Sequence, residues 1–241
     1  MKKLALTIGC AVAVTGAAFA QGTLNWNTFA PTGITLQLNG GISPFFGGSA
    51  SVSGTFLGTG ANSYYFELLY NTAFTGSQTA APSLAALTSS AWIDSGLKAN
   101  NSTASAGKMT PVGANVSAVP AGTWVGGIGA LGGTTNNIVL VGWSSNLGST
   151  WATVAGILAD WPAQSASIVG SAYFGVSNTG YIVPNIFPAT GAALFANALN
   201  ANGMPINSVN TQLYLLPVPE PATFALAGLG GLAMLMFRRR K

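Results

Sequence analysis

Apolar and polar residues alternate along much of this chain with the period of two that is typical of β-strands. The segment 34–38 alternates Ile, Leu and Leu with Thr and Gln, and the turn signal Asn-Gly-Gly follows at 39–41. Further candidate strands, most of them bounded by Gly, Pro or Asn, are 52–56, 64–70, 91–97, 122–128, 138–143, 172–176 and 213–216.

The segment 64–70 is rich in aromatic residues and apolar on both faces apart from Glu67, so we expect a central strand there. Many short strands at this spacing indicate a mainly β fold, an antiparallel β-sandwich or jelly roll. We expect Phe66, Leu68, Val139, Val141 and Phe174 to lie in its core.

Two segments have the spacing of a helix. Trp151, Val154, Ala155 and Leu158 fall at i, i+3, i+4 and i+7, and Pro162 is expected to stop this helix. The same spacing recurs between Ala192 and Leu199. Both segments are short, and a loop is the alternative for each. The stretch 98–118 is rich in small polar residues, which predicts a mobile loop or a poorly packed sheet edge.

The N-terminus has the three parts of a secretory signal peptide. Lys2 and Lys3 are followed by a small apolar stretch, 4–18, and by Ala18-Phe19-Ala20, an A-x-A cleavage site before Gln21. Residues 1–20 are therefore predicted to form a signal helix that the general secretion machinery uses and signal peptidase removes. The chain's one cysteine, Cys10, lies inside this segment.

The C-terminus, 218–241, also has three parts. Val218 precedes Pro219-Glu220-Pro221, which the two prolines should keep extended. The uncharged run 222–237 follows, and inside a bilayer it can satisfy its backbone as a helix of roughly 24 Å. The chain ends on the four cations that should hold this end in the cytoplasm, Arg238, Arg239, Arg240 and Lys241.

This arrangement resembles the PEP-CTERM sorting signal of Gram-negative bacteria that make exopolysaccharide. The resemblance rests on Pro219-Glu220-Pro221, the apolar run and the closing basic cluster, about a tenth of the chain. It implies recognition by an exosortase, a membrane-embedded, transpeptidase-like cysteine protease. It also implies a transient stage at the inner membrane and delivery to the cell surface or extracellular matrix.

The charge pattern changes once both ends are set aside. The formal charge of +4 comes from the two terminal segments, whereas the body, 21–217, has two lysines against three carboxylates. Such a body has no basic patch to neutralise phosphates, so nucleic acid is not an expected partner. Its 197 residues suffice for one domain with a substantial core.

Reactive side chains are scarce in the body. The chain has no histidine, and its one cysteine lies in the signal segment, so a Ser-His-Asp triad, a Cys-His pair and a conventional zinc site are excluded from the body. Three carboxylates remain: Glu67, expected at an exposed or edge position, Asp94 in a predicted turn, and Asp160 at a predicted helix end. We therefore predict no catalytic residue, metal site or cofactor.

Six tryptophans are the remaining positive feature of the body. They fit a packed core best, with sugar-stacking platforms as the alternative. Three classes of function stay open: a structural or adhesive protein embedded in exopolysaccharide, a carbohydrate-binding module, and a glycoside hydrolase using Glu67, Asp94 or Asp160. The scarcity of reactive groups favours the first class, in a biofilm or matrix.

Overall fold

The structure is a computed structural model of the 241-residue chain. It describes residues 22–26, 35–37, 55–73, 75–77, 79–114, 116–118, 124–127, 132–186, 190–207 and 212–216.

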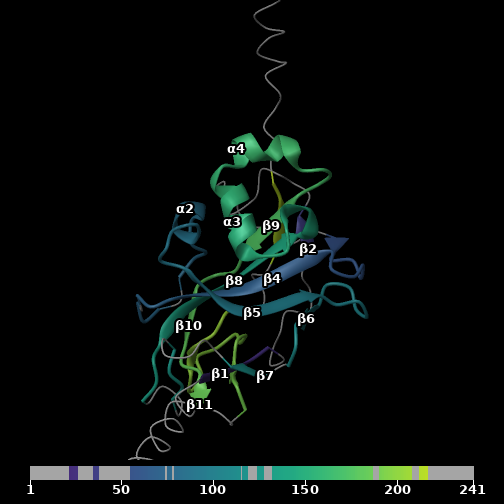
Figure 1. Cartoon of the computed structure of the whole chain (residues 1–241). Helices are drawn as coiled ribbons and strands as arrows, with labels where there is room; N and C mark the ends of the chain where they lie inside the picture. The colour runs from purple at the N-terminus through teal and green to yellow at the C-terminus, as the bar shows by residue number, and fades with distance from the viewer. Residues whose placement is uncertain are drawn as a thin grey trace, which may run out of the picture.

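A large sheet forms the centre of the described part of the chain (Figure 1). Its main strand order is β3-β2-β14-β9-β8-β4-β5-β6, and β10 and β13 extend it beside β8. Its pairs are antiparallel apart from β2 with β14. The strands are β2 (Thr35–Gln37), β3 (Thr55–Phe56), β4 (Tyr64–Asn71), β5 (Ile93–Asn101), β6 (Met109–Pro111), β8 (Asn136–Ser144), β9 (Tyr173–Val176), β10 (Gly180–Ile182), β13 (Gly203–Met204) and β14 (Leu213–Leu215).

A second, four-stranded sheet surrounds β1 (Gly22–Asn25). That strand pairs antiparallel with β11 (Asn185–Ile186) and β7 (Val116–Ala118), and parallel with β12 (Ala192–Ala193). Figure 1 shows these strands at one end of the molecule and the helices at the other. The large sheet therefore lies between them.

β4 and β8 supply side chains to two separate cores. Phe66 and Leu68 of β4 belong to the core that also contains residues of β1 and β12. Leu69 of β4 belongs to the core that contains the helices, as do Val139 and Val141 of β8. Successive residues of a strand point to opposite faces, so the apolar composition of β4 on both faces follows from its central place. All five predicted core residues are at most 1% exposed.

Short helices pack on one face of the large sheet: α2 (Leu84–Leu87), η2 (Ser145–Leu147), α3 (Trp151–Ala159), α4 (Trp161–Gln164) and η3 (Ser165–Ser167). The predicted helix at 151–158 is confirmed as α3, with Thr150 as its N-cap. Pro162 lies in the first turn of α4, where the lack of an N–H costs nothing. The proline thus begins a second helix immediately after the first has ended.

Three expectations about secondary structure differ, wholly or in part, from the described structure. The segment from Ala192 has helical spacing but begins with β12, and Leu199, its last predicted apolar position, is 67% exposed. Residues 124–127 form isolated bridges and no named strand. The expected loop at 98–118 begins with the last residues of β5, because these pair with both β4 and β6. The edge part of that expectation fits β6, the last strand on its side of the sheet.

The fold is mainly β and predominantly antiparallel, as the alternating pattern predicts. The predicted strands near 34–38, 64–70, 138–143, 172–176 and 213–216 are confirmed as β2, β4, β8, β9 and β14. Packing as a two-layer sandwich or jelly roll stays a prediction. Within the described residues, no helix has the length and apolar character needed to cross a membrane. The predicted signal and membrane helices, 1–20 and 218–241, lie outside those residues.

Candidate functional site

The predicted sorting segment follows directly on a strand inside the large sheet. β14 lies between β2 and β9. Leu216, the next residue, is 2% exposed and belongs to the core that contains the helices. Its N–H donates to the carbonyl of Ala172 at 2.8 Å. The chain is therefore buried and hydrogen-bonded as far as Leu216, the residue before Pro217.

The residues predicted for processing all lie outside the described part of the chain. These are Ala18, Ala20 and Gln21 at the signal cleavage site, Val218, Pro219, Glu220 and Pro221 at the sorting motif, and Arg238, Arg239, Arg240 and Lys241 at the basic end. Their assignment therefore rests on the sequence.

Within the body, Glu67 is the carboxylate that the structure encloses. It lies in the middle of β4 and is 1% exposed, so the expectation of an exposed or edge position is wrong. The sequence pattern placed Glu67 in an apolar strand. It could not indicate that α3, which begins 84 positions later, would donate a hydrogen bond to its carboxylate.

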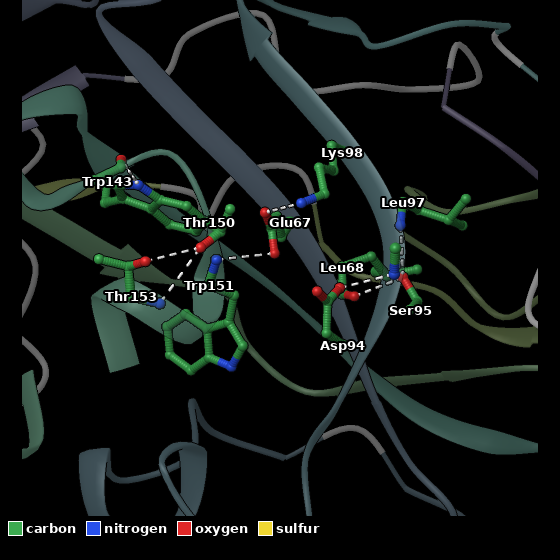
Figure 2. A network of polar contacts seen from close by, with 12 residues as sticks. Glu67, Leu68, Asp94, Ser95, Leu97, Lys98, Trp143, Thr150, Trp151 and Thr153 are labelled. Atoms are coloured by element: carbon green, nitrogen blue, oxygen red, sulfur yellow. Dashed lines mark hydrogen bonds and ion pairs between the residues drawn. The ribbon is translucent and has the colours of Figure 1, made fainter. Parts of the chain in front are cut away.

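Two groups hold the Glu67 carboxylate (Figure 2). Oε1 lies 2.8 Å from Nζ of Lys98, its cross-strand partner on β5, and forms an ion pair with it. Oε2 accepts a hydrogen bond from the main-chain N–H of Trp151 at 3.2 Å. Trp151 is the first residue of α3, where the free N–H groups and the helix dipole favour a negative charge.

Burial raises the pKa of the Glu67 carboxyl above its ordinary value of 4.5. The Lys98 ammonium and the Trp151 N–H act in the opposite direction, and the nearby Asp94 carboxylate adds to the rise. Asp94 thus faces the same cluster from β5, as Figure 2 shows. The arrangement places an acidic group at the start of α3 and joins that helix to β4 and β5.

Asp94 lies in a bulge of β5, where the sequence predicts a turn. Pairing passes from Glu67 with Lys98 to Leu69 with Asp94, so a step of two residues along β4 corresponds to a step of four residues along β5. Asp94 Oδ1 accepts from the Gly96 N–H at 2.7 Å, and Gly96 adopts a φ of 72° that favours glycine. The local turn chemistry was therefore identified correctly, although it lies inside a strand.

Asp160 lies elsewhere, between the two helices. It is exposed, follows the last residue of α3 as predicted, and its carbonyl accepts from the N–H groups of Ala163 and Gln164. The described residues contain no group of three or more His, Cys, Asp or Glu side chains that could together hold a metal ion. The three carboxylates thus occupy a buried pair, a strand bulge and a helix junction.

The tryptophans lie in the cores. Trp26, Trp124, Trp143, Trp151 and Trp161 are at most 6% exposed. Trp92 is half-buried and packs against the helical core. Trp124 stacks on Tyr70 at 5.0 Å between ring centroids, and Trp151 stacks on Phe174 at 6.1 Å. The core interpretation holds for these residues, so a sugar-stacking platform of exposed tryptophans is not part of the described surface.

Comparison with known families identifies the C-terminal segment. Residues 217–241 match the PEP-CTERM protein-sorting motif, one residue longer than the predicted segment. Searches among curated proteins and solved structures give no match. The chain therefore carries a PEP-CTERM sorting motif, which implies an exported protein directed to the cell surface with an exosortase as its processing partner.

Proposed function

We propose that this chain is a surface or extracellular-matrix protein with a structural or adhesive role in exopolysaccharide or biofilm. Signal peptidase would release it at Gln21, and the exosortase would process it from a transient inner-membrane stage. The observation that carries the proposal is the sorting motif at 217–241, because this address leads to the cell exterior. We further propose that the two sheets of the body pack as a β-sandwich.

The chemistry of the body supports a role without catalysis. Glu67 is 1% exposed and engaged by Lys98 and Trp151. Asp94 Oδ1 is engaged in a turn within β5, and Asp160 lies apart from both at the helix junction. A neutral surface rich in Asn, Ser and Thr exchanges hydrogen bonds with polysaccharide hydroxyls at a low cost of desolvation. Weak contacts repeated over many copies retain such a protein through avidity.

The experiment that tests the sorting role compares three forms of the full-length gene product in its own host. We expect the unchanged chain at the cell surface, and we expect deletion of residues 219–241 to release a folded body into the medium. A third form replaces Pro219, Glu220 and Pro221 by alanine and keeps the apolar run and the basic end. Retention of this form in the inner membrane is the expected result, and its normal delivery to the surface would contradict exosortase sorting.

The glycoside hydrolase alternative has its own test. The chain recovered from the surface is incubated with the host's exopolysaccharide, and new reducing ends are measured. We expect none. Hydrolysis that disappears in Glu67→Gln or Asp160→Asn would establish an enzyme and overturn the structural role.

A further inference from the structure

An open pocket lies where β5 meets the edge strand β6 and the turn before β4. Its volume is about 320 Å³, within the usual range for small-ligand sites. Its described lining residues are Asn62, Asn100, Asn101, Thr103, Thr110, Pro111 and Val112. The other hollow of interest, between Phe66, Gly142 and Gly175, is about 10 Å³ and so admits no more than a water molecule.

The lining combines amides, hydroxyls and a small apolar surface. The body's five charged residues all lie in described segments, and none of them lines the pocket. An Asn side chain both donates and accepts hydrogen bonds, and a Thr hydroxyl does the same. Val112, which is 57% exposed, supplies apolar area beside them. This combination matches a sugar ring, whose hydroxyls donate and accept and whose C–H groups are apolar.

The pocket is held in shape by hydrogen bonds beneath it. Asn101 is 3% exposed, and its Nδ2 donates to the carbonyls of Gly58 and Gly60 at 2.9 and 2.7 Å. Its Oδ1 accepts from the N–H of Tyr64 at 3.0 Å. These bonds join the turn to the end of β5, so the rim is preorganised for a ligand.

Asn62 occupies an unusual backbone conformation at this rim. Its φ is 54°, and it is the described part's one non-glycine residue with positive φ. It is the third residue of a turn closed by the Ser63 N–H and the Gly60 carbonyl, a position where glycine is the usual choice. Asparagine adds a side chain whose Oδ1 accepts from Asn100 Nδ2 at 2.8 Å. Within the described residues, Nδ2 of Asn62 and Oδ1 of Asn100 have no hydrogen-bond partner, and Asn62 is exposed.

We propose that this pocket is a binding subsite for an uncharged sugar unit of a polysaccharide, contacted by Asn62, Asn100 and Thr110. The lining has no carboxylate for a cation and no cation for an anionic sugar. Lys98, which shares this face of β5, is paired with Glu67. Pro111 on the edge strand lacks the N–H that a docking peptide strand would use. This inference rests on the proposed role in exopolysaccharide and adds to it a site and a ligand class.

The test uses the mature chain recovered from the cell surface after isotope labelling, and follows Asn side-chain amide signals by NMR. The neutral probes are cellohexaose, maltohexaose and N-acetylchitohexaose, and an alginate hexamer is the anionic probe. We expect a neutral probe to shift the Asn62 and Asn100 signals and alginate to leave them unchanged.

Matched variants locate the binding. Asn62→Gly keeps the positive φ and removes the amide, and Thr110→Val removes a hydroxyl at nearly constant shape. Each should weaken binding roughly 3–10-fold, the equivalent of one hydrogen bond. Gln164→Ala on α4 should bind as the unchanged chain does, and Thr110→Ser, which keeps the hydroxyl, should bind more tightly than Thr110→Val. Unchanged thermal melting of all four variants would exclude unfolding as the cause.

Three outcomes would overturn the subsite. The first is no shift with any neutral probe. The second is binding by Asn62→Gly and Thr110→Val that is as tight as binding by the unchanged chain. The third is shifts that follow protein concentration without sugar, which would assign the edge to a second copy of the chain. In each case normal surface delivery would leave the proposed function standing. Failure of delivery, or hydrolysis of a probe, would overturn the proposed function itself.

Discussion

One face of β5 has two different surroundings within three residues. At Lys98 the face is partly closed: the side chain is 36% exposed, its ammonium pairs with the buried Glu67, and the first residue of α3 donates a hydrogen bond to that carboxylate. At Asn100 the same face is open, and the lining is uncharged amides and hydroxyls. The comparison indicates that this protein uses a charged pair inside to join its layers and exposes neutral hydrogen-bonding groups at the neighbouring pocket. An uncharged hydrogen-bonding surface of this kind is consistent with the proposed adhesion to polysaccharide.

The largest expected effect comes from opening the closed region. Glu67→Ala removes the partner of Lys98 and the acceptor of the Trp151 N–H, and leaves a cavity below α3. We expect a loss of about 2–4 kcal/mol in the free energy of unfolding, measured with urea. Glu67→Gln, which retains an acceptor for Trp151, should lose much less. Equal losses in the two variants would show that the negative charge of Glu67 and its ion pair with Lys98, and not the acceptor for Trp151 or the shape of the side chain, provide the stability.

A smaller effect is expected at the residue below the open region. Asn101→Ala removes an amide that bonds Gly58, Gly60 and Tyr64, so partly buried backbone groups lose their partners. The expected loss is about 1–3 kcal/mol by the same urea measurement. Asn100→Ala, its neighbour at the pocket, should change stability by about 0.5 kcal/mol or less. A reversed order would mean that the pocket side chains support the fold.

The smallest effect is a pH dependence specific to the closed region. Because burial raises the pKa of Glu67, the folded protein holds this proton more tightly than the unfolded chain does. The resulting stability is fully present below the unfolded pKa and is lost as the pH rises through the folded value. Urea midpoints should therefore fall from pH 4 to pH 7 more steeply in the unchanged chain than in Glu67→Gln. Equal pH dependence of the urea midpoints in the unchanged chain and in Glu67→Gln would contradict a raised pKa of Glu67 in the folded protein.

Local sequence patterns predicted α3 and the strands β2, β4, β8, β9 and β14, because period and capping are local properties. They failed where a distant segment decides the outcome. Glu67 is buried beside α3, which begins 84 positions later in the sequence. The segment from Ala192 has helical spacing but forms β12, because it pairs in parallel with β1. The turn at Asp94 was recognisable and lies inside the predicted strand 91–97, but the bulge there depends on pairing with β4.

The two candidate sites differ in the same way. The sorting motif is a linear signal, so its order of Pro-Glu-Pro, apolar run and basic end is readable without a fold. The pocket is assembled from the turn at Asn62, the end of β5 and strand β6. No single segment carries a signal for it, and the positive φ of Asn62 becomes evident in the structure alone.

The central claim is that the chain reaches the cell surface through removal of both terminal segments, and an intact-mass measurement of surface-recovered protein tests it most directly. We predict a mass that corresponds to a start at Gln21 and a C-terminus lacking Arg238, Arg239, Arg240 and Lys241. A mature surface protein that still carries the complete tail through Lys241 would contradict exosortase processing and reduce the segment to a membrane anchor.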